Sequence, residues 1–305
     1  MFSVWELILQ QTINGLILGS FYALVALGYS MVYGIIKLLN FAHGDIFMVG
    51  AFVCFSVFSS IVMAMPGWPG ILLSILAAML IAGIVGYSAQ RFAYRPLIKA
   101  DAPRLSLLIT AIGVSLVIYN AVMVITGSRT FFFQSGLDAY PIVSMGEFRL
   151  TDIQLILLSV SAALMFGLTF LIKNTMVGKA MRAIALDKDT CRLMGINVNK
   201  IIGITFFIGS ALAAIASGMY CVVYVNVAFD MGYMFGIKAF TAAVIGGIGS
   251  IPGAMLGGLL LGLLESMGTQ LLGSQWKDVF AFGLLIIILI FRPNGLMGKT
   301  EIERM

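Results

Sequence analysis

The chain is a succession of long apolar runs separated by short polar connections, and this pattern constrains its fold more than any other feature. A helix needs about 20 apolar residues to cross a hydrocarbon core of roughly 30 Å. The alternation of apolar and polar residues that marks a transmembrane β-barrel is absent from these runs. We therefore predict an all-α, polytopic bundle of about eight or nine transmembrane helices. The apolar runs cover residues 7–33, 41–65, 70–90, 105–126, 153–172, 201–225, 239–268 and 278–291.

Composition agrees with a membrane protein along the whole length. Of the 305 residues 61% are hydrophobic and 10% are charged, where soluble domains carry roughly a quarter charged residues. Residues 1–305 are therefore interpreted as one transmembrane domain. The net charge of +5 does not indicate a nucleic-acid partner, because the basic residues lie in short loops. The three cysteines form no CxxC pair and are predicted to be small core residues, with no metal site.

Small residues recur four apart in several runs, which is typical of close helix contacts in lipid. The pairs are Gly15 with Gly19, Gly253 with Gly257, and Gly258 with Gly262. Packing within one subunit and a dedicated dimer interface both fit this spacing, and we favour the first.

Charge in the loops predicts the orientation. The basic residues are concentrated in the loops 91–104 and 173–200, whereas the loop 126–152 carries only two basic residues, Arg129 and Arg149, against three acidic ones, Asp138, Glu147 and Asp152. By the positive-inside rule the first two loops are cytoplasmic, which places the N-terminus outside. Eight crossings would leave the basic C-terminal tail outside as well, so we favour nine over eight.

The seventh run supplies the additional crossing if it breaks at its centre. Glycine and proline there cannot continue a regular helix without losing backbone hydrogen bonds. A broken helix at membrane depth is tolerated where protein or a wet cavity satisfies the freed groups. The first half is short, so a re-entrant element is an alternative to a full crossing. The residues predicted to form the break are Gly246, Gly247, Gly249, Pro252 and Gly253.

No catalytic motif accompanies these runs. The tail ends in Gly298-Lys299-Thr300, but a phosphate-binding loop requires a glycine where this chain has Pro293. The sequence shows no Ser-His-Asp order, HExxH motif or paired metal ligands. We therefore expect a protein that is not an enzyme and has no ATPase site of its own.

One polar cluster, in the stretch "NFAHGD", interrupts the apolar pattern. Asn40, His43 and Asp45 are expected at the cytoplasmic mouth of the second run, with Asn40 as the N-cap of its helix and Asp45 near the positive helix end. The sharper hypothesis is that Asn40 and His43 line an inner gate and that His43 makes transport sensitive to pH. Other polar candidates for the pathway or gate lie inside further runs. They are Asn14, Ser20, Tyr22, Asn120 and Glu265.

The loop 173–200 has the pattern of two short amphipathic helices. Thr175 is predicted to cap a helix that runs to about Leu186, and Asp189 to cap a second turn that Gly195 ends. Met181 and Ile184 would lie on one side of the first helix. Docking to a soluble partner and a membrane-surface helix held by anionic lipid both fit this loop, and the residues alone do not separate them.

Three blocks of sequence resemble the LivH-type permease subunits of branched-chain amino acid ABC importers. They are "GYSMVYGIIKLLNFAHGDIFMVGAF", "GKAMRAIALDKDTCRLMGI" and "FTAAVIGGIGSIPGAMLGGLLLGLLE", and the likeness runs along nearly the whole chain. The resemblance implies a subunit of the bacterial inner membrane that translocates leucine, isoleucine or valine. It also implies that the chain binds no cofactor, because separate ATPase subunits use the ATP.

The resemblance implies partners as well. They are a second, LivM-like permease subunit, two cytoplasmic ATPases and a periplasmic binding protein. The loop 173–200 would be the coupling segment seated on an ATPase. The residues that match it are Gly178, Ala180, Met181, Arg182, Ala183, Asp187, Leu193 and Gly195. The same architecture importing urea, short amides or other amino acids is an alternative, and an ion-coupled secondary transporter is a more distant one.

Overall fold

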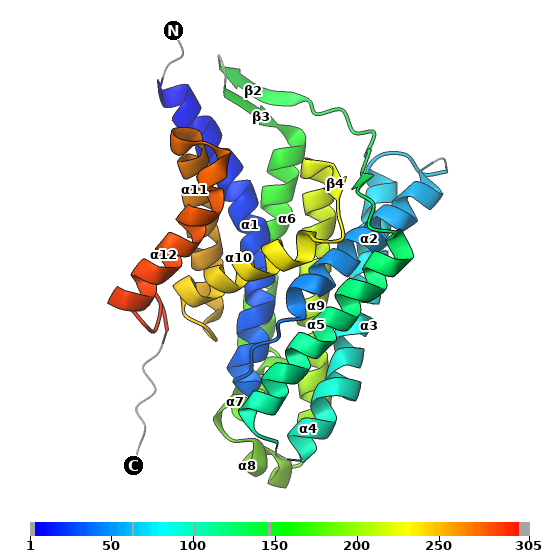
Figure 1. The fold of residues 1–305 in the computed structure, drawn as a ribbon, viewed down its shortest axis with the longest axis vertical. Coiled ribbons are helices and arrows are strands. Elements are labelled where there is room, and N and C mark those ends of the chain that lie inside the picture. The colour runs from blue at the N-terminus through cyan, green and yellow to red at the C-terminus, as the bar shows by residue number, and fades with distance from the viewer. Residues whose placement is uncertain (1–3, 63, 101, 146–147, 299–305) are drawn as a thin grey trace. The chain divides into compact units, whose positions relative to one another are not determined.

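The computed structural model describes all residues except 1–3, 63, 101, 146–147 and 299–305, so Lys299 and Thr300 of the tail motif lie outside it. The described part is mainly helical (Figure 1). The longer helices are α1 (Val4–Ile36), α2 (His43–Ile61), α3 (Trp68–Ala89), α5 (Arg104–Thr126), α6 (Asp152–Asn174), α9 (Val198–Tyr224), α10 (Met231–Gly246), α11 (Ile251–Leu272) and α12 (Lys277–Phe291). The shorter elements are η1 (Gln90–Tyr94), α4 (Arg95–Lys99), α7 (Met176–Leu186), α8 (Lys188–Leu193) and η2 (Ser274–Trp276), with strands β1 (Phe131–Phe132), β2 (Pro141–Met145), β3 (Phe148–Thr151) and β4 (Asn226–Val227).

Eight helices in the described residues are long and apolar enough to cross a bilayer, which confirms the polytopic helical bundle. A further apolar helix, α10, has 16 residues and a length of about 24 Å. These nine helices correspond to the eight apolar runs with the seventh run divided in two. The α10 helix begins at Met231, earlier than the predicted start at residue 239.

The third apolar run extends further than predicted. We expected a loop from Arg91, but the helix continues through the π-helical turn η1 and through α4 to Lys99. Pro96 does not end it, and lies in the first turn of α4 directly after the π-helical turn. The two strand pairs were not predicted either. β2 pairs with β3 in an antiparallel hairpin, and β1 pairs with β4.

The chain divides into two compact units. The first is drawn from Met1–Ser30, Asp138–Gly167 and Lys238–Met305, and the second from Met31–Leu137 and Leu168–Ile237. In the second unit α2, α3 and α9 pack on one another, and glycines permit the close approach. A Cβ on Gly50 of α2 would lie 2.7 Å from Cα of Ala214 on α9. The buried thiols of Cys54, Cys191 and Cys221 are unpaired core groups, as predicted.

In the first unit the predicted glycine faces bring α1 against α11. A Cβ on Gly15 would lie 2.8 Å from Cα of Leu263, and one on Gly19 would lie 2.9 Å from the carbonyl oxygen of Gly258. A Cβ on Gly262 would overlap the backbone of Gly19. These glycines therefore serve packing within one subunit, which was the favoured interpretation.

The predicted break in the seventh run is confirmed between α10 and α11. Gly247 and Gly249 have φ values of 103° and 88°, a region that side chains with a Cβ rarely adopt. Pro252 lies in the first turn of α11, whose N-cap Ser250 accepts the N–H of Gly253 at 3.3 Å. Carbonyl groups freed at the end of α10 accept backbone N–H groups of the C-terminal segment. Leu296 donates to Ile245 and Met297 donates to Gly246, each at 2.9 Å.

Candidate functional site

The polar side chains of the stretch "NFAHGD" are buried in the second unit. Asn40, His43 and Asp45 are 3%, 1% and 4% exposed. The hydroxyl of Tyr94 donates to Oδ1 of Asn40 at 2.9 Å, and the hydroxyl of Ser115 donates to Oδ2 of Asp45. Asn40 and Asp45 thus each have a partner from a different helical segment, so the cluster joins the start of α2 to η1 and to α5.

The prediction that Asn40 caps α2 is wrong. The N-cap position is Ala42, with no side-chain hydrogen bond, and Asn40 lies two residues earlier. Only the backbone oxygen of Asn40 reaches the helix, where it accepts the N–H of His43 at 3.1 Å. The physical reason is the turn Phe41–Ala42, which separates Asn40 from the helix and leaves its amide facing the buried phenol of Tyr94.

The other candidates for the pathway lie in different surroundings. In the first unit Asn14 is part-buried and accepts the amide of Gln10 at 3.3 Å, while Tyr22 is 2% exposed. In the second unit Asn120 is exposed, and its amide donates to the carbonyl oxygen of Leu116 in the same helix. Asn120 is therefore separate from the buried cluster around Asn40.

The helices α7 and α8 form the segment that was predicted from the loop 173–200. Thr175 caps α7 by accepting the N–H of Gly178 at 3.2 Å, and α7 ends at Leu186, both as predicted. The cap of α8 is Asp187, whereas Asp189 was predicted. Gly195 follows α8 with φ of 80°, which agrees with its predicted role as a helix stop.

Asp187 is a strong cap because it accepts several donors at once. Its carboxylate accepts the hydroxyl of Thr190 and the N–H groups of Asp189 and Thr190. These hydrogen bonds favour the charged form and lower the pKa of Asp187 below its usual value. The sequence misplaced this cap because Asp187 and Asp189 are both suitable cap residues two positions apart.

The residues that match the coupling pattern divide into a packed group and an exposed group. Gly178 and Met181 are buried, and a Cβ on Gly178 would overlap the backbone of Ile172 at the end of α6. Arg182 folds back, and its guanidinium donates to the carbonyl oxygens of Ile172 and Lys173 at 3.0 and 3.1 Å. Ala180 and Ala183 are half-buried, and Asp187 and Gly195 are exposed.

This segment exposes large apolar side chains among its charged and polar ones. Four side chains, those of Met176, Leu186, Leu193 and Met194, are 78%, 90%, 88% and 78% exposed. We call these four residues the α7–α8 apolar face. The pattern identified Leu193 alone. With Met181 and Ile184 facing inward, helical periodicity could have identified the other three as outward-facing apolar residues.

A buried ion cluster in the first unit was only partly expected. Glu265 of α11 is fully buried, and its Oε1 lies 2.8 Å from Nζ of Lys238 and 3.1 Å from Nζ of Lys277. Nζ of Lys238 also lies 2.7 Å from Asp278. The sequence singled out Glu265, but not Lys238, which lies just before the start of the predicted seventh run. The described residues contain no group of three His, Cys, Asp or Glu side chains that could hold a metal ion.

Eight long apolar helices, a glycine break satisfied by backbone donors and an exposed amphipathic segment define a multi-pass membrane protein with a transporter-like organisation. Comparison with known proteins is consistent with this class. The chain belongs to the family described as "Branched-chain amino acid transport system / permease component", which it matches over residues 11–289.

Two relatives match the chain over nearly its whole length. The chain is 46% identical over 303 residues to the high-affinity branched-chain amino acid transport system permease protein BraD of Pseudomonas aeruginosa, covering 97% of each chain. It is 42% identical over 301 residues to LivH of Escherichia coli K12, again with 97% of each chain covered. A ribose import permease of Haemophilus influenzae is 25% identical over 185 residues, which cover 58% of this chain and 56% of that protein.

Proposed function

We propose that this chain is the membrane-spanning permease subunit of an ABC importer that translocates branched-chain amino acids. The observation that carries the proposal is similarity over 97% of the chain to permeases named for high-affinity branched-chain amino acid transport. A periplasmic binding protein would deliver the amino acid to the permease in the bacterial inner membrane. A second, LivM-like permease would complete the pathway, and two cytoplasmic ATPases would drive the transport cycle, so that this chain has no ATPase site of its own and binds no cofactor.

The α7–α8 apolar face is the proposed contact with an ATPase. Residues 173–200 lie between α6 and α9 and carry six basic residues, which places them on the cytoplasmic side by the positive-inside rule. Large apolar side chains exposed to this degree on a short, well-capped helical pair are typical of a protein interface. The packed residues Gly178 and Met181 and the backbone contacts of Arg182 would transmit movement of this segment to α6 and α9.

The pathway needs polar groups, because an amino acid zwitterion is costly to place in an apolar environment. The cluster of Asn40, His43 and Asp45 is a candidate for the inner gate. It is buried, and η1, to which Asn40 is bonded, contains Arg91 and is followed by Arg95 on the predicted cytoplasmic side. Opening such a gate would require the bond between Tyr94 and Asn40 to break or move.

The proposed coupling is tested by purification of the assembled transporter from cells. Leu186→Ser combined with Leu193→Ser should reduce the amount of ATPase that copurifies by about tenfold or more, since each buried interface leucine contributes about 1 kcal/mol. Uptake of labelled leucine should fall in parallel. Met65→Ser is the matched control, because Met65 is 49% exposed in the connection between α2 and α3, on the predicted outer side.

The two parts of the proposal fail separately. Normal ATPase recovery by the double variant would exclude the apolar face as the contact. Accumulation of solute by the isolated subunit in vesicles without nucleotide or companion chains would exclude an ABC importer altogether. Titration of the cognate binding protein with leucine, urea and short amides would decide the substrate.

A further inference from the structure

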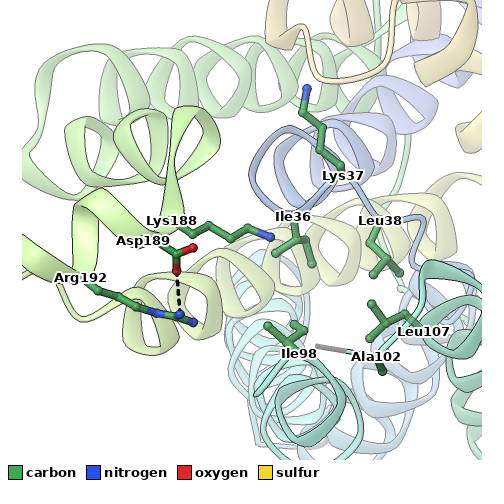
Figure 2. Close-up of a pocket in the computed structure, with 9 residues that line it drawn as sticks. All are labelled: Ile36, Lys37, Leu38, Ile98, Ala102, Leu107, Lys188, Asp189 and Arg192. Atoms are coloured by element: carbon green, nitrogen blue, oxygen red, sulfur yellow. Dashed lines mark hydrogen bonds and ion pairs between the residues drawn. The ribbon is translucent and has the colours of Figure 1, made fainter. Parts of the chain in front are cut away.

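A pocket of about 310 Å³ lies within the second unit, where α1, α4, α5 and α8 come together. Its apolar wall consists of Ile36, Leu38, Ile98, Ala102 and Leu107, and its polar residues are Lys37, Lys188, Asp189 and Arg192. Figure 2 shows the apolar side chains of Ile36, Ile98 and Leu107 on one side and α8 with its charged residues on the other. The pocket is separate from the buried cluster around Asn40 and from the α7–α8 apolar face.

The charge of the pocket favours an anionic ligand. Three of its four ionisable residues are basic. Lys188 and Arg192 lie four residues apart on α8, and the side chain of Lys188 extends toward Ile36 (Figure 2). The single acidic residue, Asp189, is engaged through its Oδ1 by Nη1 of Arg192 at 2.9 Å, at the exposed edge. A guanidinium has five N–H donors in a planar fork, so one such contact leaves capacity for a phosphate oxygen.

The position and the apolar wall point to a lipid as the source of that anion. The pocket lies where the basic ends of membrane-crossing helices meet, which the positive-inside rule assigns to the cytoplasmic leaflet, where anionic lipid head groups gather. A volume of about 310 Å³ accommodates a glycerophosphate group but not two whole acyl chains. The five aliphatic residues of the wall suit the glycerol and the first methylene groups of the acyl chains.

We propose that this pocket binds the phosphate group of an anionic phospholipid, such as phosphatidylglycerol, between α8 and the ends of α1, α4 and α5. Lys188 and Arg192 would hold the phosphate, and Ile36, Ile98 and Leu107 would contact the glycerol region. Because α8 follows directly from α7, a bound lipid would also fix the position of the segment that carries the α7–α8 apolar face. The proposal does not depend on which solute the permease carries.

The test is native mass spectrometry of the full purified chain in detergent, with phosphatidylglycerol or phosphatidylcholine added in turn. We expect a clear preference for phosphatidylglycerol. Lys188→Gln combined with Arg192→Gln should weaken retention of that lipid about 30-fold, since each basic residue near an anionic surface contributes about fivefold. The matched control is Lys179→Gln with Lys200→Gln, which removes the same charge from exposed positions outside the pocket.

A second variant tests the shape of the pocket independently of its charge. Ala102→Leu would fill part of the pocket with every charge intact, and it should also lower retention of phosphatidylglycerol. An unchanged elution profile and helicity would show that each variant is folded. Three results would overturn the proposal. They are an equal loss of phosphatidylglycerol in the control pair, equal retention of the two lipids by the unmodified chain, and full retention of phosphatidylglycerol by Ala102→Leu. Displacement of the lipid by millimolar inorganic phosphate would overturn it in favour of a soluble phosphate ligand.

Discussion

Glu265→Gln is the most informative single substitution in the first unit. The glutamine keeps the shape of the side chain and removes its charge. The change leaves Nζ of Lys238, a residue that is 6% exposed, with Asp278 at 2.7 Å as its acidic partner. Lys277 also loses its contact with Glu265 but is 38% exposed and can be solvated.

The expected cost follows from these contacts. Removal of one partner from a buried ion pair lowers the free energy of unfolding by about 3–5 kcal/mol. Because Asp278 still faces Lys238, we expect the lower end, about 3 kcal/mol. For a chain of this size, about 2 °C of melting temperature corresponds to each kcal/mol, so the midpoint should fall by about 6 °C.

Thermal unfolding of the purified protein in a single detergent measures this effect. Asp278→Asn is the control for a partly exposed partner, since the side chain of Asp278 is 49% exposed, and it should cost about 1 kcal/mol or less. Lys238→Met combined with Glu265→Met removes both buried charges and should restore the midpoint to within about 2 °C, because a well-packed apolar pair can replace a buried ion pair. Lys238→Met and Glu265→Met are also measured singly. If their costs simply add in the double variant, the reasoning is refuted.

Three further substitutions test the packing and the gate. Gly262→Leu should lower the free energy of unfolding by about 3 kcal/mol, because the new side chain would meet the backbone of α1. Gly113→Leu is the control in the same melting experiment. It should be nearly neutral, because open space surrounds Gly113. Tyr94→Phe removes the donor to Asn40 and should cost about 1 kcal/mol, and an equal loss when Asn40 is already alanine would contradict the pairing. If His43 belongs to the gate, His43→Gln should change the dependence of leucine uptake on pH between about 5.5 and 8, the range in which histidine side chains typically change charge. An unchanged rate and profile would exclude that role.

Local features of the sequence predicted much of the segment that carries the apolar face. Thr175 caps α7, and Gly195 stops α8, because both effects depend on residues within one turn. The cap at Asp187 was missed where two suitable residues stand close together. The role of Arg182 was missed because its acceptors belong to the last turn of α6, nine and ten residues away.

The sequence by itself determined which segments are long and apolar enough to cross a membrane and where the seventh run breaks. Both follow from properties carried by consecutive residues, namely apolar length and the backbone preferences of glycine and proline. Only the tertiary structure decided which polar groups meet. Asn40 and Tyr94 are 54 positions apart, and Lys238 and Glu265 are 27 apart. Each of these side chains could form its hydrogen bond or ion pair with several other polar groups of the chain. Helix packing selects one partner by bringing it within hydrogen-bond distance of the side chain. The same packing excludes water from the buried groups, so they depend on that partner.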